Sequence, residues 1–144
     1  MKVYLSANHI RVPELRAVAN LLSARGHEVV STWIYSERPE ELSQAYDISR
    51  TDIADIWACD VFVYLADRVL RGQGDRFAQL GCAYANRKRC IVVGVVEDEE
   101  RLPYSLEGIV RLPDIVAVFD WLDRFSAPPT TRPGVDDLLD GGDA

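Results

Sequence analysis

The sequence predicts an α/β fold, in which a five-stranded parallel sheet of strand order 2-1-3-4-5 carries helices on both faces. Short apolar runs rich in β-branched residues alternate with longer segments whose apolar residues recur at helical spacing. This alternation continues through residues 2–125 and is typical of parallel strands joined by helices. A chain of 144 residues is also close to the usual size of one domain.

The centre of the predicted fold is the stretch of residues 60–94. Apolar runs at residues 61–66 and 90–94 predict two buried strands, and residues 75–86 between them predict a helix. Such a βαβ unit is right-handed and its strands are parallel. The glycine-containing loop before the helix therefore lies at the carboxyl edge of the sheet, where open α/β folds bind their ligands.

Two more strands and two more helices precede this unit. Residues 2–7 predict a strand, because Val3 and Leu5 alternate with Tyr4 and Ser6, and residues 27–32 predict a second strand, because they are rich in β-branched residues. Pro13 suits the first turn of a helix and Gly26 suits its C-terminal cap, so a helix is expected between them. The apolar spacing within residues 39–58 predicts a second amphipathic helix.

The C-terminal part of the chain is expected to complete the sheet. Residues 115–119, with the sequence IVAVF, predict the fifth strand, and residues 120–125 predict a short helix after it. Proline, glycine and aspartate then interrupt the chain repeatedly. We therefore expect one domain at residues 1–126 and a disordered acidic tail at residues 127–144.

Composition limits the classes of partner. The net charge of −7 disfavours binding to duplex nucleic acid, although a single nucleotide responds to local amides and is not excluded. The apolar runs are too short to cross a bilayer, and no export signal opens the sequence, so a cytoplasmic location is expected. The three cysteines lack the spacing of a zinc site or a disulfide framework, and no metal or other cofactor is expected.

In the predicted strand order, the switch point lies between strands one and three. Polar residues from both strand ends should therefore meet in one crevice. They are Tyr4, Ser6, Asn8 and His9 from the first strand and its loop, and Asp67, Arg68, Arg71, Asp75 and Arg76 from the central unit, around the turn that contains Gly72 and Gly74.

Each of these residues has an ordinary structural interpretation as well. The Gly72-Gln73-Gly74 turn before a helix favours an anion such as phosphate, but it also suits a loop that needs positive φ. Arg76 fits either a 5′-phosphate or the surface. Asp52 precedes Ile53 at the rim of an apolar helix face, where a solvated carboxylate is common, and Tyr4 fits a buried strand residue.

Several motifs, in order along residues 2–125, favour the functional interpretation of these residues over the structural one. They are KVYLSA at 2–7, PELR at 13–16, RGHEV at 25–29, Asp52, DVFV at 60–63, GDRFAQLGCA at 74–83 and RCIVVG at 89–94. Together they resemble the nucleoside 2-deoxyribosyltransferase-like family. The resemblance implies a flavodoxin-like fold and an enzyme of nucleotide metabolism, a transferase or hydrolase that cleaves N-glycosidic bonds of nucleosides or nucleoside 5′-monophosphates. It also implies a homodimer or a higher homo-oligomer.

The same resemblance implies roles for individual residues. A family carboxylate that attacks the anomeric carbon matches Gln79, the family tyrosine that orients it matches Tyr4, and an acidic residue facing the base matches Asp52. Asp67 matches an acidic position after the third strand. Ser6, Asn8, Gly72, Gly74 and Arg76 complete the expected substrate site. Proton delivery to the departing base is a reasonable role for Asp52, because a leaving base needs protonation near neutral pH.

Gln79 is the main departure from the family pattern. An amide is neutral and a far poorer nucleophile than a carboxylate, so the chain should be nearly inert by the family mechanism. Either Gln79 replaces a glutamate deliberately, which would trap substrate, or the natural chain binds without turnover. A non-catalytic sensor that binds a nucleotide or an NAD-like ligand is therefore the competing hypothesis. A flavodoxin-like electron carrier is weaker, because the loop after the first strand has few hydroxyl groups.

Overall fold

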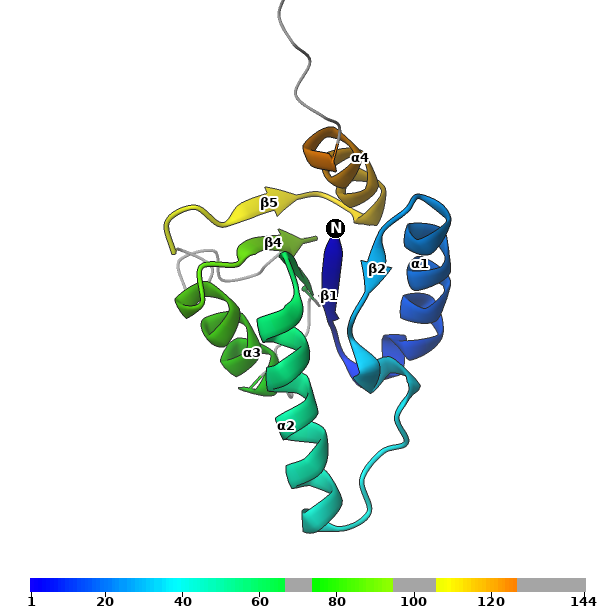
Figure 1. Cartoon of the computed structure of the whole chain (residues 1–144), viewed down its shortest axis with the longest axis vertical. Helices are drawn as coiled ribbons and strands as arrows, with labels where there is room; N and C mark the ends of the chain where they lie inside the picture. The colour runs from blue at the N-terminus through cyan, green and yellow to red at the C-terminus, as the bar shows by residue number, and fades with distance from the viewer. Residues whose placement is uncertain (67–73, 95–105, 127–144) are drawn as a thin grey trace, which may run out of the picture.

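The computed structural model describes residues 1–66, 74–94 and 106–126 (Figure 1). The elements in chain order are β1 (Lys2–Ser6), the 3₁₀ helix η1 (His9–Arg11), α1 (Val12–Ala24), β2 (Glu28–Val29), the 3₁₀ helix η2 (Thr32–Tyr35), α2 (Leu42–Ala58), β3 (Val61–Leu65), α3 (Gly74–Ala85), β4 (Arg89–Val93), β5 (Val110–Leu112) and α4 (Ile115–Ser126). Strands and helices thus alternate along the chain up to β4.

The sheet has five parallel strands in the order β2-β1-β3-β4-β5, as predicted. β3 lies in the middle, with Val3 of β1 level with Val61 on one side and Ile91 of β4 level with Val63 on the other. All five residues of β3 are buried, as expected of a central strand in a sheet covered on both faces. The flavodoxin-like fold class is therefore confirmed.

Alternate side chains of the strands point to two separate hydrophobic clusters. One face, with Leu5 and Val63, packs against α1 and α4 through residues such as Leu15 and Leu122. The other face carries Tyr4, Phe62, Tyr64 and Val92 and packs against α2 and α3 through Ile56, Leu80 and Ala83. Helices thus cover both faces of the sheet, and the second face is the one that leads to the candidate site.

The predicted boundaries of the first two strand–helix pairs differ from the structure only at their ends. Gly26 has a φ of 83°, a value that suits a glycine just after a helix, and α1 ends two residues earlier. β2 contains two residues instead of six, although the Val30 amide still donates to the Val3 carbonyl. α2 begins at Leu42, because Glu41 is extended and the chain is not yet helical there.

The predicted fifth strand is wrong. Residues 115–119 form the first turns of α4, and the edge strand is Val110–Leu112 instead. The Asp114 carboxylate accepts a hydrogen bond from the Ala117 amide at 2.9 Å, which caps the helix. Val118 and Leu122 then lie one turn apart and are both buried against the sheet. A run of five apolar residues is compatible with either element, and here the cap and the packing decide for the helix.

No helix in the described part of the chain is long and apolar enough to cross a membrane. The tail expected at residues 127–144 lies outside the described residues, so its disorder stays a prediction.

Candidate active site

A cavity of about 780 Å³ opens beyond the carboxyl end of β1. Its wall combines the segment after β1, the loop after η2, one side of α2 and the start of α3. The lining residues are Ala7, Asn8, His9, Ile10, Trp33, Ser36, Glu37, Arg38, Pro39, Ala45, Ile48, Ser49, Asp52, Ile53, Asp75, Arg76, Ala78 and Gln79. The volume is large enough for a nucleoside-sized ligand.

Gln79 lies in the second turn of α3 and links three elements. The Ser6 hydroxyl of β1 donates to Gln79 Oε1 at 2.8 Å, and Gln79 Nε2 donates to Asp52 Oδ2 of α2 at 3.3 Å. An ionised carboxylate only accepts hydrogen bonds, so the contact with Asp52 requires the amide nitrogen on that side. The orientation of the Gln79 side chain at the cavity wall is therefore fixed by both neighbours.

Asp52 lies on the cavity side of α2 and is half-buried, not solvated at the rim. Burial, with a smaller contribution from the Asp55 charge, raises the pKa of the Asp52 carboxyl to about 6. Contacts with the Tyr4 hydroxyl and the Gln79 amide act in the opposite direction and favour the ionised form. Asp52 can therefore hold or release a proton near neutral pH, as a general acid must.

Tyr4 and Ser6 are fully buried and lie beneath the cavity, outside its lining residues. The Tyr4 ring stacks on Phe62 with centroids 5.4 Å apart. Its hydroxyl oxygen and Asp52 Oδ1 are both buried, and neither atom has a hydrogen-bond partner within residues 1–66, 74–94 and 106–126. Burial and the nearby Asp52 charge raise the Tyr4 pKa far above its usual value, so the hydroxyl stays protonated beside that carboxyl.

Asn8 and Arg76 both line the cavity, as expected. The Asn8 side chain accepts a hydrogen bond from the Ile10 amide at 3.1 Å, and so fixes the start of η1. The Arg76 residue is only 4% exposed, and its guanidinium lies 5.8 Å from the centre of the Tyr64 ring. Arg76 is therefore a cation built into the site and not a solvated surface residue.

The glycine loop of the predicted site is only partly described. Gly74 is the first residue of α3, which places the helix N-terminus next to the cavity residues Asp75 and Arg76. Asp67 and Gly72 lie outside the described residues, so their predicted roles in substrate binding remain predictions. Among the described residues, no group of three or more histidine, cysteine, aspartate or glutamate side chains could hold a metal ion.

The sequence interpretation missed the wall formed by α2 and the loop before it. Ala45, Ile48 and Ser49 face the cavity, and Trp33 closes it near β1, where its indole nitrogen donates to the Leu5 carbonyl at 2.8 Å. The apolar spacing of α2 is typical of a core-facing helix, but only Ile56 of this helix is buried. A periodic apolar pattern shows which side chains share one face of a helix. It does not show whether that face packs in the core or lines a cavity.

Solved structures with the same arrangement of elements include two enzymes. The 2-deoxyribosyltransferase of the psychrotolerant bacterium Bacillus psychrosaccharolyticus superposes with a TM-score of 0.65 at 16% identity, over 82% of this chain and 90% of that one. The CMP N-glycosidase BcmB of Clostridium botulinum gives a TM-score of 0.57 at 16% identity, over 85% and 99%. At this identity the likeness establishes a shared fold. No family model matches the chain, and a search of curated proteins gives no match.

Proposed function

We propose that the chain is a member of the nucleoside 2-deoxyribosyltransferase-like family and that its cavity binds a nucleoside or a nucleoside 5′-monophosphate. The observation that carries the proposal is the Gln79 side chain, held at the cavity wall between Ser6 and Asp52. The motif resemblance assigns the attacking carboxylate to this position. The two solved enzymes with this fold support the proposal, because one is a 2-deoxyribosyltransferase and the other a CMP N-glycosidase.

The proposed reaction needs a carboxylate at position 79. Its oxygen would form a bond to the anomeric carbon while the bond from that carbon to the base breaks, and the electron pair leaves with the base. The departing base takes a proton, and Asp52, with its pKa near 6, supplies one from the adjacent helix. Water or a second base then releases the sugar from position 79. With glutamine at position 79 the attack on the anomeric carbon fails, so this chain binds its ligand without cleaving it.

One observation favours the second candidate, a non-catalytic nucleotide sensor. Both ends of the Gln79 amide are satisfied, by a hydroxyl donor at Oε1 and a carboxylate acceptor at Nε2. A glutamate in the same position would place two carboxylates about as close together as this 3.3 Å contact. One of the two would then keep its proton or move away. Position 79 thus accommodates the amide of glutamine as well as it would the nucleophilic carboxylate of glutamate.

The substitution Gln79→Glu separates the two candidates. We expect it to release free base from nucleosides or 5′-monophosphates at least about a hundredfold faster than the unchanged chain, which corresponds to about 2.7 kcal/mol of transition-state stabilisation. Gln44→Glu makes the same chemical change on the exposed start of α2 and serves as the matched control. Ligand binding without base release, from both the unchanged chain and the Gln79→Glu variant, would reject the enzyme and leave the sensor.

Arg76 is the described residue that bears on the choice between nucleoside and nucleotide. Its buried guanidinium lies next to the N-terminus of α3, and both features attract an anion. We therefore propose the 5′-monophosphate as the preferred ligand. Comparing the affinity of the unchanged chain for a nucleoside and for its 5′-monophosphate tests this directly, and equal affinities would contradict it.

A further inference from the structure

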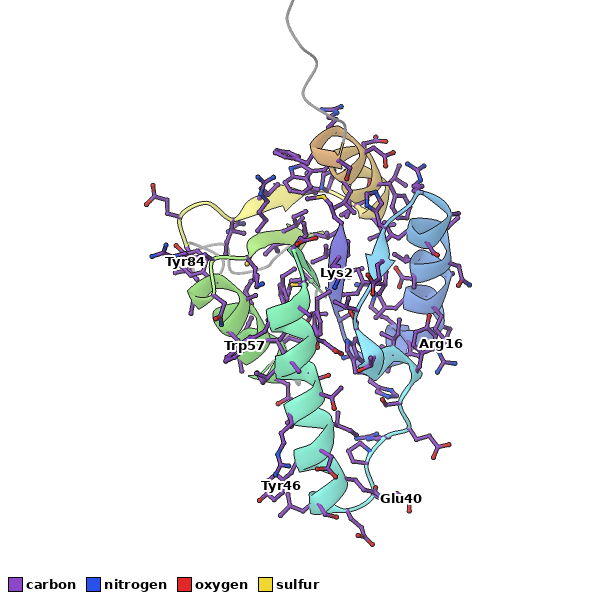
Figure 2. All side chains as sticks on the ribbon, viewed as in Figure 1. Lys2, Arg16, Glu40, Tyr46, Trp57 and Tyr84 are labelled. Carbon is purple, nitrogen blue, oxygen red and sulfur yellow. The ribbon has the colours of Figure 1, made fainter. Side chains whose placement is uncertain are left out.

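Three carboxylates of the described residues line the cavity, and each belongs to a different wall. Glu37 lies in the loop before α2, Asp52 lies in α2, and Asp75 lies in the first turn of α3. Figure 2, in which the labelled Glu40 marks that loop, shows the loop and α3 on opposite sides of α2. A ligand group held against α3 therefore lies nearer to Asp75 than to Glu37.

Asp75 lies one turn before Gln79, on the same face of α3. Residues four apart on a helix have Cβ atoms about 5–6 Å apart, and both of these residues line the cavity. Burial and the Asp55 charge are the main causes that raise the pKa of Asp52, and the Asp75 charge adds to them. The carboxylates of Asp52 and Asp75 thus face the same space, on either side of Gln79.

Among the polar side chains around Gln79, Asp75 is the one left for a ligand. Ser6 and Asp52 are hydrogen-bonded to the Gln79 amide, and the Asn8 oxygen accepts from the Ile10 amide. Asp75 has no hydrogen bond or ion pair with any other residue in the described part of the chain. An ionised carboxylate only accepts hydrogen bonds, and its two oxygens can accept from two donors at once. Asp75 therefore suits a ligand group with two neighbouring donors.

A 5′-phosphate at Arg76 leaves this carboxylate free for other groups of the ligand. Successive residues of a helix project about 100° apart, so Asp75 and Arg76 point in different directions. The Arg76 guanidinium is directed inward, 5.8 Å from the centre of the Tyr64 ring, whereas Asp75 is exposed. The phosphate and the sugar hydroxyl groups of one nucleotide can thus bind on two sides of the same helical turn.

The sugar of a nucleotide supplies such a pair of donors. In the proposed complex the anomeric carbon lies at Gln79, and the next two ring carbons carry the 2′- and 3′-hydroxyl groups. These groups come within reach of the Asp75 carboxylate when the sugar lies along this face of α3. Acidic side chains bind the ribose 2′-hydroxyl in the same manner in dinucleotide-binding sheets. A 2′-deoxyribose has only the 3′-hydroxyl and leaves one carboxylate oxygen without its donor.

We propose that Asp75 binds the 2′- and 3′-hydroxyl groups of the ligand and selects ribonucleoside 5′-monophosphates over their 2′-deoxy counterparts. The inference rests on the proposed function, because it needs a nucleotide in the cavity. It does not depend on whether that nucleotide is cleaved. The sugar in the family name, 2-deoxyribose, is thus not the one that Asp75 favours.

Paired titrations of the unchanged chain test this preference, since Gln79 leaves the ligand intact. Calorimetry with AMP, GMP, CMP and UMP, and with the four 2′-deoxy counterparts, gives one ratio of dissociation constants for each base. For the base that binds best, the 2′-deoxynucleotide should have a dissociation constant at least about tenfold higher, because a hydrogen bond to a charged acceptor is lost. The corresponding 3′-deoxynucleotide should show a similar loss.

Two alanine variants assign the preference to Asp75. Asp75→Ala should bring the ratio to within about twofold, mainly because the ribonucleotide binds more weakly. Asp120→Ala removes an exposed carboxylate of α4, outside the cavity, and should leave the ratio unchanged. Asp75→Ala also removes an acid that favours the start of α3, but each ratio compares two ligands on the same protein and is insensitive to this. Circular dichroism verifies that both variants fold.

The outcomes separate this inference from the proposed function. Equal affinities for the two sugars, tighter binding of the 2′-deoxynucleotide, or a ratio that persists in Asp75→Ala would overturn the inference and leave the proposed function standing. If none of the eight nucleotides binds the unchanged chain at about 1 mM, the proposed function is rejected and the inference with it.

Discussion

Replacing Asp52 with asparagine should stabilise the protein while it removes the proposed proton donor. The Asp52 carboxyl lies half-buried between the Tyr4 hydroxyl and the Gln79 amide, and burial raises its pKa to about 6. Ionisation of Asp52 is therefore less favourable in the folded chain than in the unfolded one. Asparagine carries no charge, and its Oδ1 can still accept the hydrogen bond from Gln79 Nε2.

The expected stabilisation by Asp52→Asn follows from the size of the Asp52 pKa shift. The pKa rises from an ordinary value of 3.8 to about 6, which at about 1.36 kcal/mol per unit would correspond to about 3 kcal/mol for a group sealed from water. Because Asp52 is partly exposed and solvent screens its charge, about 1–2 kcal/mol is the expected cost of ionising it. Between about pH 4 and pH 6, the Asp52 carboxyl is protonated in the folded chain and ionised in the unfolded chain. Stability due to this group therefore falls as the pH rises through that window.

Urea unfolding at two pH values measures this cost. At pH 8, Asp52→Asn should raise the free energy of unfolding by about 1–2 kcal/mol, and at pH 4 the gain should be close to zero. Asp47→Asn makes the same change on an exposed residue of the same helix and should alter the stability little at either pH. An Asp52→Asn protein that is no more stable than the unchanged chain at pH 8, or whose gain is the same at both pH values, would refute the electrostatic account.

Two further substitutions test the contacts that position the site and the last helix. Ser6→Ala removes the hydroxyl that donates to Gln79 Oε1 and should cost about 1 kcal/mol of stability and weaken nucleotide binding, as measured by urea unfolding and calorimetric titration. Retained affinity would show that Ser6 does not orient Gln79. Asp114→Ala removes the N-terminal cap of α4 and should lower the free energy of unfolding by about 0.5–2 kcal/mol without altering ligand affinity. An unchanged midpoint in urea would contradict the role of the cap.

The strand order was predictable, because right-handed connections between parallel strands leave few arrangements of five strands. The position of the fifth strand was not predictable. The apolar run at residues 115–119 satisfies both a buried strand and a helix, and the deciding contacts are the Asp114 cap and the packing of Val118 on the sheet. The short strand at Val110–Leu112 carries no pattern that distinguishes it from a loop.

The candidate site was predictable only where strand ends define it. The chain order places Ser6, Asn8 and the start of α3 at one edge of the sheet, and the structure has them there. Asp52 belongs to a helix whose orientation depends on tertiary packing, and its inward position was implied by the resemblance and not by its spacing. The exposure of Leu42, Tyr46 and Trp57 on α2 was likewise not predictable, since a buried row and an exposed row of apolar residues have the same helical period.

The most direct test of the central claim is a crystal structure of the unchanged chain with a nucleoside 5′-monophosphate bound. The account predicts an intact ligand in the cavity, with the anomeric carbon about 3–4 Å from the Gln79 amide and the base on the side of Asp52. A ligand whose sugar lies away from Gln79, or one bound outside this cavity, would contradict it.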